Sequence, residues 1–113
     1  MPEDWPFEEP RNTAVITLRL IMLEGAPILN VSLSDEGDWQ FLGAEQPDVQ
    51  DAMVVGLSSI VERDPSILQL HELPLGWRAW RESVHAAWKR EPDPEYSGSR
   101  TRHVRKAVWR RER

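Results

Sequence analysis

Three short runs of strand-forming residues lie between positions 13 and 43 and restrict this chain to folds that contain a sheet. The first run, Thr13 to Met22, is rich in β-branched side chains, which lose less rotamer freedom in a strand than in a helix. The second run, Ile28 to Leu33, and the third, Trp39 to Gly43, alternate apolar and polar residues. Turn residues separate the runs, so we predict three consecutive strands in a meander, with the first two antiparallel.

The middle of the chain fits a strand in one part and a helix in another. Ala52 to Val55 favours a short fourth strand, and apolar residues then recur at helical spacing from about Ser58 to Arg63. Ser58 is available as the N-cap of that helix. Asp64 precedes a proline and is expected to end it, and Pro65 can open a further helical turn.

Residues 77–90 allow two interpretations. Four large apolar residues recur at the spacing of one helical face, namely Trp77, Trp80, Val84 and Trp88. The competing interpretation is a strand over 77–82, a loop, and a second strand around Trp88. The alternation that would support these strands is the weaker pattern, so we predict a helix.

The predicted fold is therefore α+β, with a small antiparallel sheet, a meander of three or four strands, packed against one or two helices. A chain of 113 residues supports one modest core. We expect an irregular, proline-containing arm over 1–12, held to the body by Trp5 and Phe7, and a single domain over 13–91. Residues 92–113 are expected to form a linker and a basic C-terminal tail that can be helical from Thr101.

Charge divides the chain into an acidic body and a basic tail. From position 97 onward there is one acid, Glu112, against seven basic residues, so the tail carries 7 − 1 = +6. The whole chain carries −5, which leaves −5 − 6 = −11 for residues 1–96. The basic residues of the tail are Arg100, Arg102, Arg105, Lys106, Arg110, Arg111 and Arg113.

Several classes of function lack their usual sequence signals. No apolar run approaches the roughly 18 residues of a membrane span, and the acidic start is unlike a signal peptide, so we expect a cytoplasmic protein without membrane contact. The absence of cysteine excludes disulfides and thiolate zinc sites. The three histidines are widely spaced and the glycines are dispersed, so we predict no metal, no cofactor and no catalytic residue.

Candidate binding residues fall into three groups. Three acids, Asp35, Glu36 and Asp38, share one turn, which is either a solvated loop or a contact for a cation or a basic partner. The tryptophans at 39, 77, 80 and 88 either build the core or line a groove flanked by Arg78 and Arg81. The tail offers contacts to nucleic acid or to a protein through Arg100, Arg102, Arg105, Lys106, Trp109, Arg110 and Arg111.

Three segments carry a resemblance to a known group of proteins. They are Gly37-Asp38-Trp39-Gln40-Phe41-Leu42-Gly43, the junction Asp64-Pro65-Ser66-Ile67, and Leu73-Pro74-Leu75-Gly76-Trp77-Arg78-Ala79-Trp80-Arg81. Together they resemble small, uncharacterised bacterial domains of unknown function, akin to the immunity-type domains found beside polymorphic toxins. The resemblance covers about residues 12–91 and implies a compact bacterial α+β domain, with toxin neutralisation proposed for related domains. It supplies no catalytic residues, and the arginine-rich tail departs from it.

Two function classes follow, and an enzyme is the least favoured third. The first is a non-enzymatic protein-interaction module whose acidic surface engages a basic protein partner, and an immunity-like protein is one form of it. The alternative is nucleic-acid binding through the arginine-rich tail, against which the negative charge of the body would act.

Overall fold

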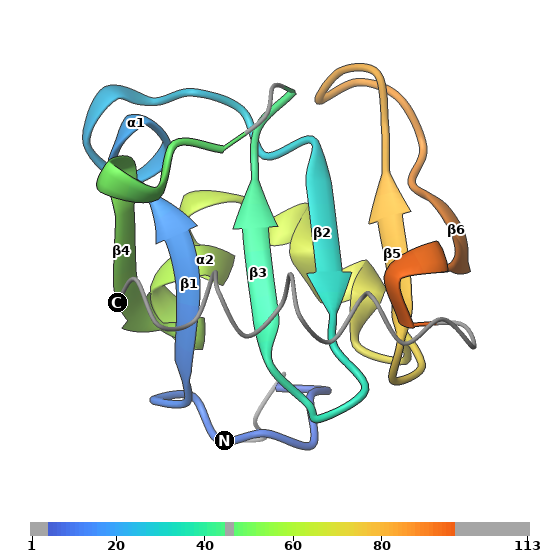
Figure 1. The fold of residues 1–113 in the computed structure, drawn as a ribbon. Coiled ribbons are helices and arrows are strands. Elements are labelled where there is room, and N and C mark those ends of the chain that lie inside the picture. Colours follow the sequence, from blue (N-terminus) through green and yellow to red (C-terminus); the bar gives the residue numbers. More distant parts are fainter. Residues whose placement is uncertain (1–4, 45–46, 97–113) are drawn as a thin grey trace.

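The computed structural model describes residues 5–44 and 47–96 and shows an α+β fold built on a six-stranded mixed sheet (Figure 1). The strands follow one another across the sheet in the order β4-β1-β3-β2-β5-β6. The α+β class is confirmed, but the sheet is larger than the predicted meander. The strands are β1 (Ala14–Leu18), β2 (Asn30–Leu33), β3 (Trp39–Leu42), β4 (Ala52–Gly56), β5 (Trp77–Trp80) and β6 (Lys89–Pro92).

The first two strands run antiparallel to each other as predicted, but they are not neighbours as a meander requires, because β3 lies between them. β1 lies between β4, to which it is antiparallel, and β3, to which it is parallel. Only β2 and β3 form the expected hairpin. A parallel pair needs a long connection between its strands, and the chain provides one because a helix follows β1 before β2 begins.

That helix, α1 (Arg19–Glu24), replaces the second half of the predicted first strand. The run Arg19-Leu20-Ile21-Met22-Leu23-Glu24 consists mostly of good helix formers, whereas β-branched residues dominate only up to position 17. Gly25 ends the helix at φ 81°, a left-handed conformation that suits glycine. The backbone N–H of Ala26 then donates to the carbonyl of Leu20 at 3.0 Å.

The second helix, α2 (Leu57–Arg63), begins one residue earlier than predicted and is not capped by Ser58. Gly56 is its N-cap, because β4 runs directly into the helix. The predicted end at Asp64 is confirmed, and Pro65 opens the 3-10 helix η2 (Pro65–Leu70) as expected. The carboxylate of Asp64 caps η2 by accepting from the backbone N–H of Ser66 at 3.0 Å.

The helix predicted over 77–90 is wrong, and the alternative with two strands is the correct interpretation. β5 pairs with β2 and β6, and residues 81–88 form the connection between β5 and β6. Aromatic residues suit a strand as well as a helix, so the spacing of the tryptophans does not separate the two. Pairing with β2, about 47 residues away in the sequence, decides the outcome.

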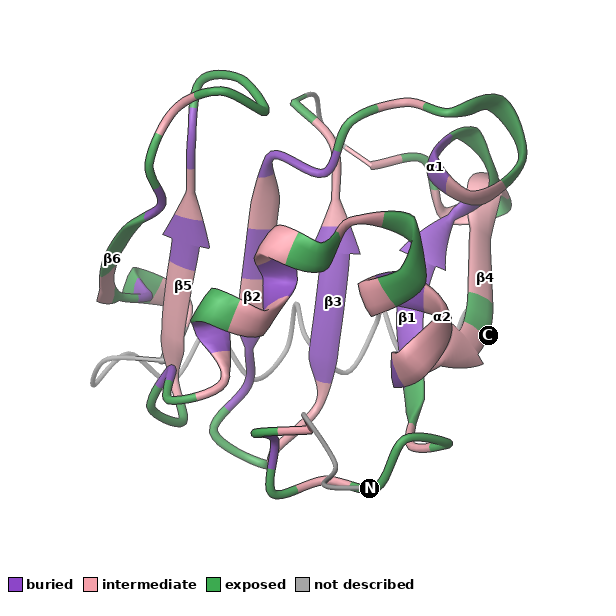
Figure 2. Cartoon of the chain, turned by 180° about the vertical axis from the view of Figure 1, so that it is seen from behind, coloured by how far each residue is buried: buried purple, intermediate pink, exposed green. Residues whose placement is uncertain are grey.

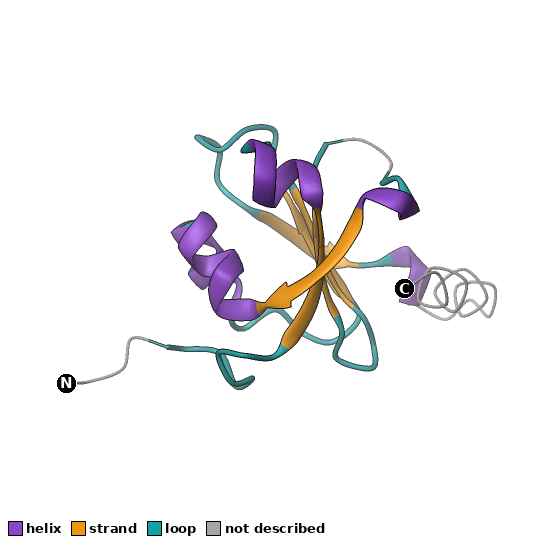
Figure 3. Ribbon diagram, turned by 90° about the vertical axis from the view of Figure 1, so that its left-hand side faces the viewer, coloured by secondary structure: helices purple, strands orange, loops and turns teal. Residues whose placement is uncertain are grey.

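One face of the sheet is covered by α1, α2 and η2 (Figures 2 and 3). The main core lies between these helices and the sheet. Phe41 is fully buried and stacks on Trp39, with ring centroids 5.6 Å apart. Phe7 of the N-terminal arm is also buried and packs edge-on against Trp39. The expectation that aromatics hold the arm to the body is therefore met, and Trp5 packs against the same core.

The predicted tryptophan core is correct in part. Trp39 and Trp88 are buried, and Trp77 packs half-buried against the core. Trp80 is half-buried as well, but the strand alternation places it on the opposite face of the sheet from Ala79. The three tryptophans and Val84 that were expected on one helical face therefore lie in β5 and in the connection that follows it.

A single row of residues crosses the opposite face of the sheet, which we call the second face. Strand register aligns one residue from each strand: Val54, Ile16, Gln40, Ser32, Arg78 and Glu91. The row is apolar at the β4 end and charged at the β6 end. Among the described elements, only the short 3-10 helices η1 (Val49–Asp51) and η3 (Pro94–Tyr96) lie on this side (Figure 3).

Candidate functional site

The turn between β2 and β3 presents the acids that the sequence singled out. Asp35 and Glu36 are exposed and Asp38 is half-buried. Ser34 shapes the turn from beneath, because its buried hydroxyl accepts from the backbone N–H groups of Glu36 at 3.1 Å and Asp38 at 3.0 Å. Gly37 supplies the left-handed residue at φ 93°. The three carboxylates are therefore carried on a hydrogen-bonded turn at one end of the sheet.

The two arginines expected to flank a groove lie in different environments. Arg78 lies on the second face, where its guanidinium forms an ion pair with Glu91 and lies 5.0 Å from the ring centroid of Trp80. Arg81 follows the end of β5, and only 2% of its side chain is exposed. The structure therefore does not bring Arg78 and Arg81 together around a groove.

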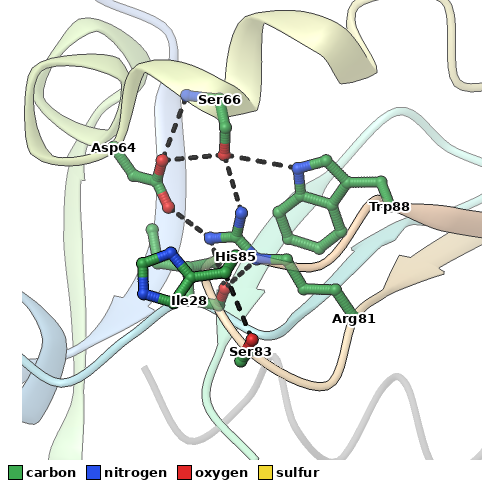
Figure 4. A network of polar contacts seen from close by, with 7 residues as sticks. All are labelled: Ile28, Asp64, Ser66, Arg81, Ser83, His85 and Trp88. Carbon is green, nitrogen blue, oxygen red and sulfur yellow. Dashed lines mark hydrogen bonds and ion pairs between the residues drawn. The ribbon is translucent and has the colours of Figure 1, made fainter.

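Arg81 is the centre of a polar network that joins three segments of the chain (Figure 4). Its Nη2 lies 2.5 Å from Oδ2 of Asp64, at the junction of α2 and η2. Its Nε and Nη2 donate to the carbonyl of Ile28 at 3.1 and 3.0 Å. Nη1 donates to Oγ of Ser66 at 3.0 Å, and the guanidinium carbon lies 4.2 Å from the ring centroid of Trp88.

The hydroxyl of Ser66 is fully used within this network. It donates to Oδ1 of Asp64 at 2.8 Å and accepts from Nη1 of Arg81 and from Nε1 of Trp88, the latter at 3.3 Å. A nucleophilic serine needs a base that takes its proton, and a carboxylate that shares its other oxygen with an arginine is poorly suited to that role. The imidazole of His85 is not what makes the hydrogen bond drawn for this residue in Figure 4. That bond runs from the backbone N–H of His85 to Oγ of Ser83. The network is therefore a structural clamp.

A pocket of about 290 Å³ lies beside the clamp. The connection from α1 to β2, the end of α2 and the exposed Val84 form its walls. Its two charged residues already have partners, because Nε of Arg63 donates to the carbonyl of Ile21 at 2.9 Å and Asp64 pairs with Arg81. The remaining lining is Gly25, Ala26, Pro27, Ile28 and Pro65, which offers shape but no reactive group.

Groups that could hold a metal ion are not found in the described part of the chain. Nowhere in residues 5–44 and 47–96 do three or more histidine, aspartate or glutamate side chains form a metal-binding group. Over the same residues, no helix has the length and apolar character needed to cross a membrane. The tail candidates Arg100, Arg102, Arg105, Lys106, Trp109, Arg110 and Arg111 lie outside the described residues, as does the predicted helix from Thr101.

Comparisons with protein-family models, with curated proteins and with solved structures find no match to this chain. The arguments about function therefore rest on its own residues.

The sequence identified the acids of the β2–β3 turn but missed the clamp. A local signal existed, since Asp64-Pro65-Ser66 is typical of a capped helix start, with an aspartate side chain accepting from the residue two positions on. Nothing local indicates that the same aspartate pairs with Arg81, which is 17 residues away. The pairing follows from the burial of an arginine, because a buried charge requires a partner.

Proposed function

We propose that this protein is a non-enzymatic interaction module that binds a basic protein partner through its acidic surface. The observation that carries the proposal is the excess of acidic over basic side chains in residues 1–96, together with the three acids on the turn between β2 and β3. Residues 1–96 contain seven basic side chains and carry a net charge of −11. Of these seven, Arg11, Arg63, Arg78, Arg81 and Arg90 make contacts within the body.

Acids outnumber basic residues by 11 over residues 1–96, so carboxylates dominate the charge of this part of the chain. Arg81 neutralises Asp64 in the interior, and Arg90 donates to the carbonyl of Gln69 at 2.9 Å. The exposed acids Asp35 and Glu36 lie at the tip of a hairpin, where they can approach another protein first. A surface with this excess of negative charge attracts a cationic partner, speeds their encounter and repels polyanions. An immunity-type protein that faces a cationic toxin is one form of this function.

Reversing the charge of the turn tests the proposal. We expect the triple variant Asp35→Lys/Glu36→Lys/Asp38→Lys to bind its partner at least about tenfold more weakly, because like charges that face each other across an interface cost several kcal/mol. The affinity of the unmodified protein should also fall as salt rises, since the Debye length is about 10 Å at 0.1 M ionic strength. The probes are purified products of neighbouring genes, and calorimetry measures the dissociation constants.

A matched control separates a local contact from a general effect of charge. The triple variant Glu62→Lys/Glu72→Lys/Glu82→Lys makes the same change in net charge at three exposed acids outside the turn. It should retain most of the affinity that the first triple loses. Equal losses in both variants would contradict a binding role of the turn, and the absence of any binding among the neighbouring products would contradict the module itself.

Nucleic-acid binding through the tail is the competing function, and the +6 charge of residues 97–113 favours it. In that case the full-length chain shifts DNA or RNA in a gel at low salt, and Arg110→Glu/Arg111→Glu removes the shift. The control Lys89→Glu/Arg90→Glu reverses an adjacent basic pair in the body and should leave the shift in place. A full-length chain that shifts neither nucleic acid at low salt excludes this function, because phosphate contacts are strongest there.

A further inference from the structure

The pocket beside the clamp is lined by an arginine that uses only one of its three guanidinium nitrogens. Arg63 ends α2, and its Nε donates to the carbonyl of Ile21 in α1 at 2.9 Å. Nη1 and Nη2 make no hydrogen bond or ion pair with residues 5–44 or 47–96. The guanidinium is therefore held in place at Nε, while the fork formed by its two terminal nitrogens keeps its donors.

Gly25 brings this fork to the wall of the pocket. Both Gly25 and Arg63 line the pocket, and a Cβ on Gly25 would lie only 2.9 Å from Nη2 of Arg63. Real Cβ atoms do not approach another heavy atom so closely. The missing side chain therefore lets the guanidinium rest against the backbone that forms one side of the pocket.

The negative charge beside the pocket is already neutralised. Asp64 is the one acid among the described residues that line it. Its Oδ2 pairs with Arg81, and its Oδ1 accepts from the backbone N–H and the hydroxyl of Ser66 (Figure 4). Because both carboxylate oxygens are engaged in the clamp, the charge that the pocket offers to a ligand is the positive charge of Arg63.

We propose that this pocket binds a carboxylate carried on a short, branched apolar group. The carboxylate accepts from Nη1 and Nη2 of Arg63, and the apolar group packs against Pro27, Pro65 and Val84. A planar carboxylate matches the fork of a guanidinium with two parallel hydrogen bonds. The volume of about 290 Å³ lies at the lower end of the range for ligand pockets, which favours a small ligand. The net charge of −11 over residues 1–96 favours one negative charge over the two of a phosphate.

The pocket is separate from the acidic turn. Ile28 lies just before β2, whereas Asp35 follows the end of that strand, so the pocket and the turn lie at opposite ends of the sheet (Figure 1). They also select opposite charges, since the turn attracts a cation and the pocket takes an anion. A charge change at one site is therefore expected to leave binding at the other unchanged.

An NMR titration of the full-length chain with N-acetyl-leucine tests the proposal. The amide signals of Gly25, Ala26 and Val84 should shift and saturate with a dissociation constant of about 1 mM or less. N-acetyl-leucinamide has the same apolar body without the charge, and it should bind at least about tenfold more weakly because charge-assisted hydrogen bonds are the stronger ones. Equal affinities for the acid and the amide would overturn the proposal, as would the lack of saturable shifts at about 10 mM acid.

Arg63→Gln should lower the affinity for N-acetyl-leucine at least about tenfold, because it removes the fork. Arg90→Gln is the matched control, since Arg90 also donates to one backbone carbonyl, that of Gln69 at 2.9 Å, and lies outside the pocket. It removes the same charge and should retain the affinity. A folded Arg63→Gln variant that binds as well as the unmodified protein would contradict a ligand on this arginine.

Arg63→Gln also removes the hydrogen bond to Ile21, so a second pair of variants tests the site at an exposed position. Val84 is 49% exposed, and a substitution there preserves the core. Val84→Asp should weaken binding of the acid about threefold or more by repulsion between like charges, whereas Val84→Asn, with the same shape and no charge, should not. Equal affinities of these two variants would show that the carboxylate does not enter the pocket.

A second probe distinguishes the two sources of such a carboxylate. Isocaproate has the branched body of leucine without the acetamido group. Tighter binding of N-acetyl-leucine would assign the ligand to the C-terminal end of a peptide, and equal or tighter binding of isocaproate would assign it to a free organic acid.

Discussion

Replacing Arg81 by methionine should lower the free energy of unfolding by about 3–5 kcal/mol, the usual cost of removing one partner of a buried ion pair. The substitution preserves most of the apolar stem but removes every donor of the guanidinium. Asp64, with 19% of its side chain exposed, then retains a charge without its ion-pair partner, and the carbonyl of Ile28 loses both donors from Arg81. Urea denaturation followed by circular dichroism measures the change.

Arg78 provides a matched control for Arg81 three positions earlier. Its side chain is 42% exposed and its partner Glu91 is 39% exposed, so water screens the pair. Arg78→Met should therefore cost no more than about 1 kcal/mol. Similar losses in the two variants would show that the clamp around Arg81 contributes no more than a surface ion pair does.

Replacing Leu70 by alanine should destabilise the protein by about 2–5 kcal/mol, because the substitution opens a cavity beneath η2 that the surrounding core fills only in part. Leu70 is fully buried at the end of η2 and belongs to the main core. The effect should appear as a lower midpoint of urea unfolding with an unchanged dependence on denaturant.

Leu75→Ala is the control, because Leu75 is 60% exposed in the connection between η2 and β5. Its replacement should change stability by no more than about 0.5 kcal/mol in either direction. If the two leucine variants lost equal stability, η2 would not be the buried layer that the fold assigns to it.

Local patterns in the sequence predicted those elements whose signals lie within a few residues. β2, β3 and β4 follow from alternation and turns, and the boundary at Asp64-Pro65 follows from the steric restriction that proline imposes. The strand order could not be predicted in the same way. The parallel pairing of Ile16 with Gln40 joins residues 24 positions apart, and no turn between them records it.

The two errors in secondary structure have separate physical causes. Residues 19–22 fall within the predicted strand because Ile21 continues a β-branched run, although leucine and methionine favour a helix there. Trp77 and Trp80 were assigned to a helix because their spacing fits one, although the sheet places them on opposite faces of β5. In the second case tertiary pairing, and not local preference, selects the structure.

The candidate binding site was more accessible to sequence reasoning than the clamp. A cluster of acids in a turn is visible in four consecutive positions, and the structure places Asp35, Glu36 and Asp38 on that turn. The partner of Arg81 depends on which segments the fold brings together. Sequence reasoning therefore identified Arg81 as a residue of interest but assigned it to a groove, whereas its guanidinium is held inside the protein.

The outermost strands of the sheet differ in how they resist aggregation. β6 consists of Lys89, Arg90, Glu91 and Pro92, and its charges and the missing N–H of proline discourage strand addition. β4, with the sequence Ala-Met-Val-Val-Gly, has neither form of protection in its own residues. Partly unfolded molecules are therefore expected to associate through β4, and a lysine in place of Val54 should keep them dispersed at high concentration.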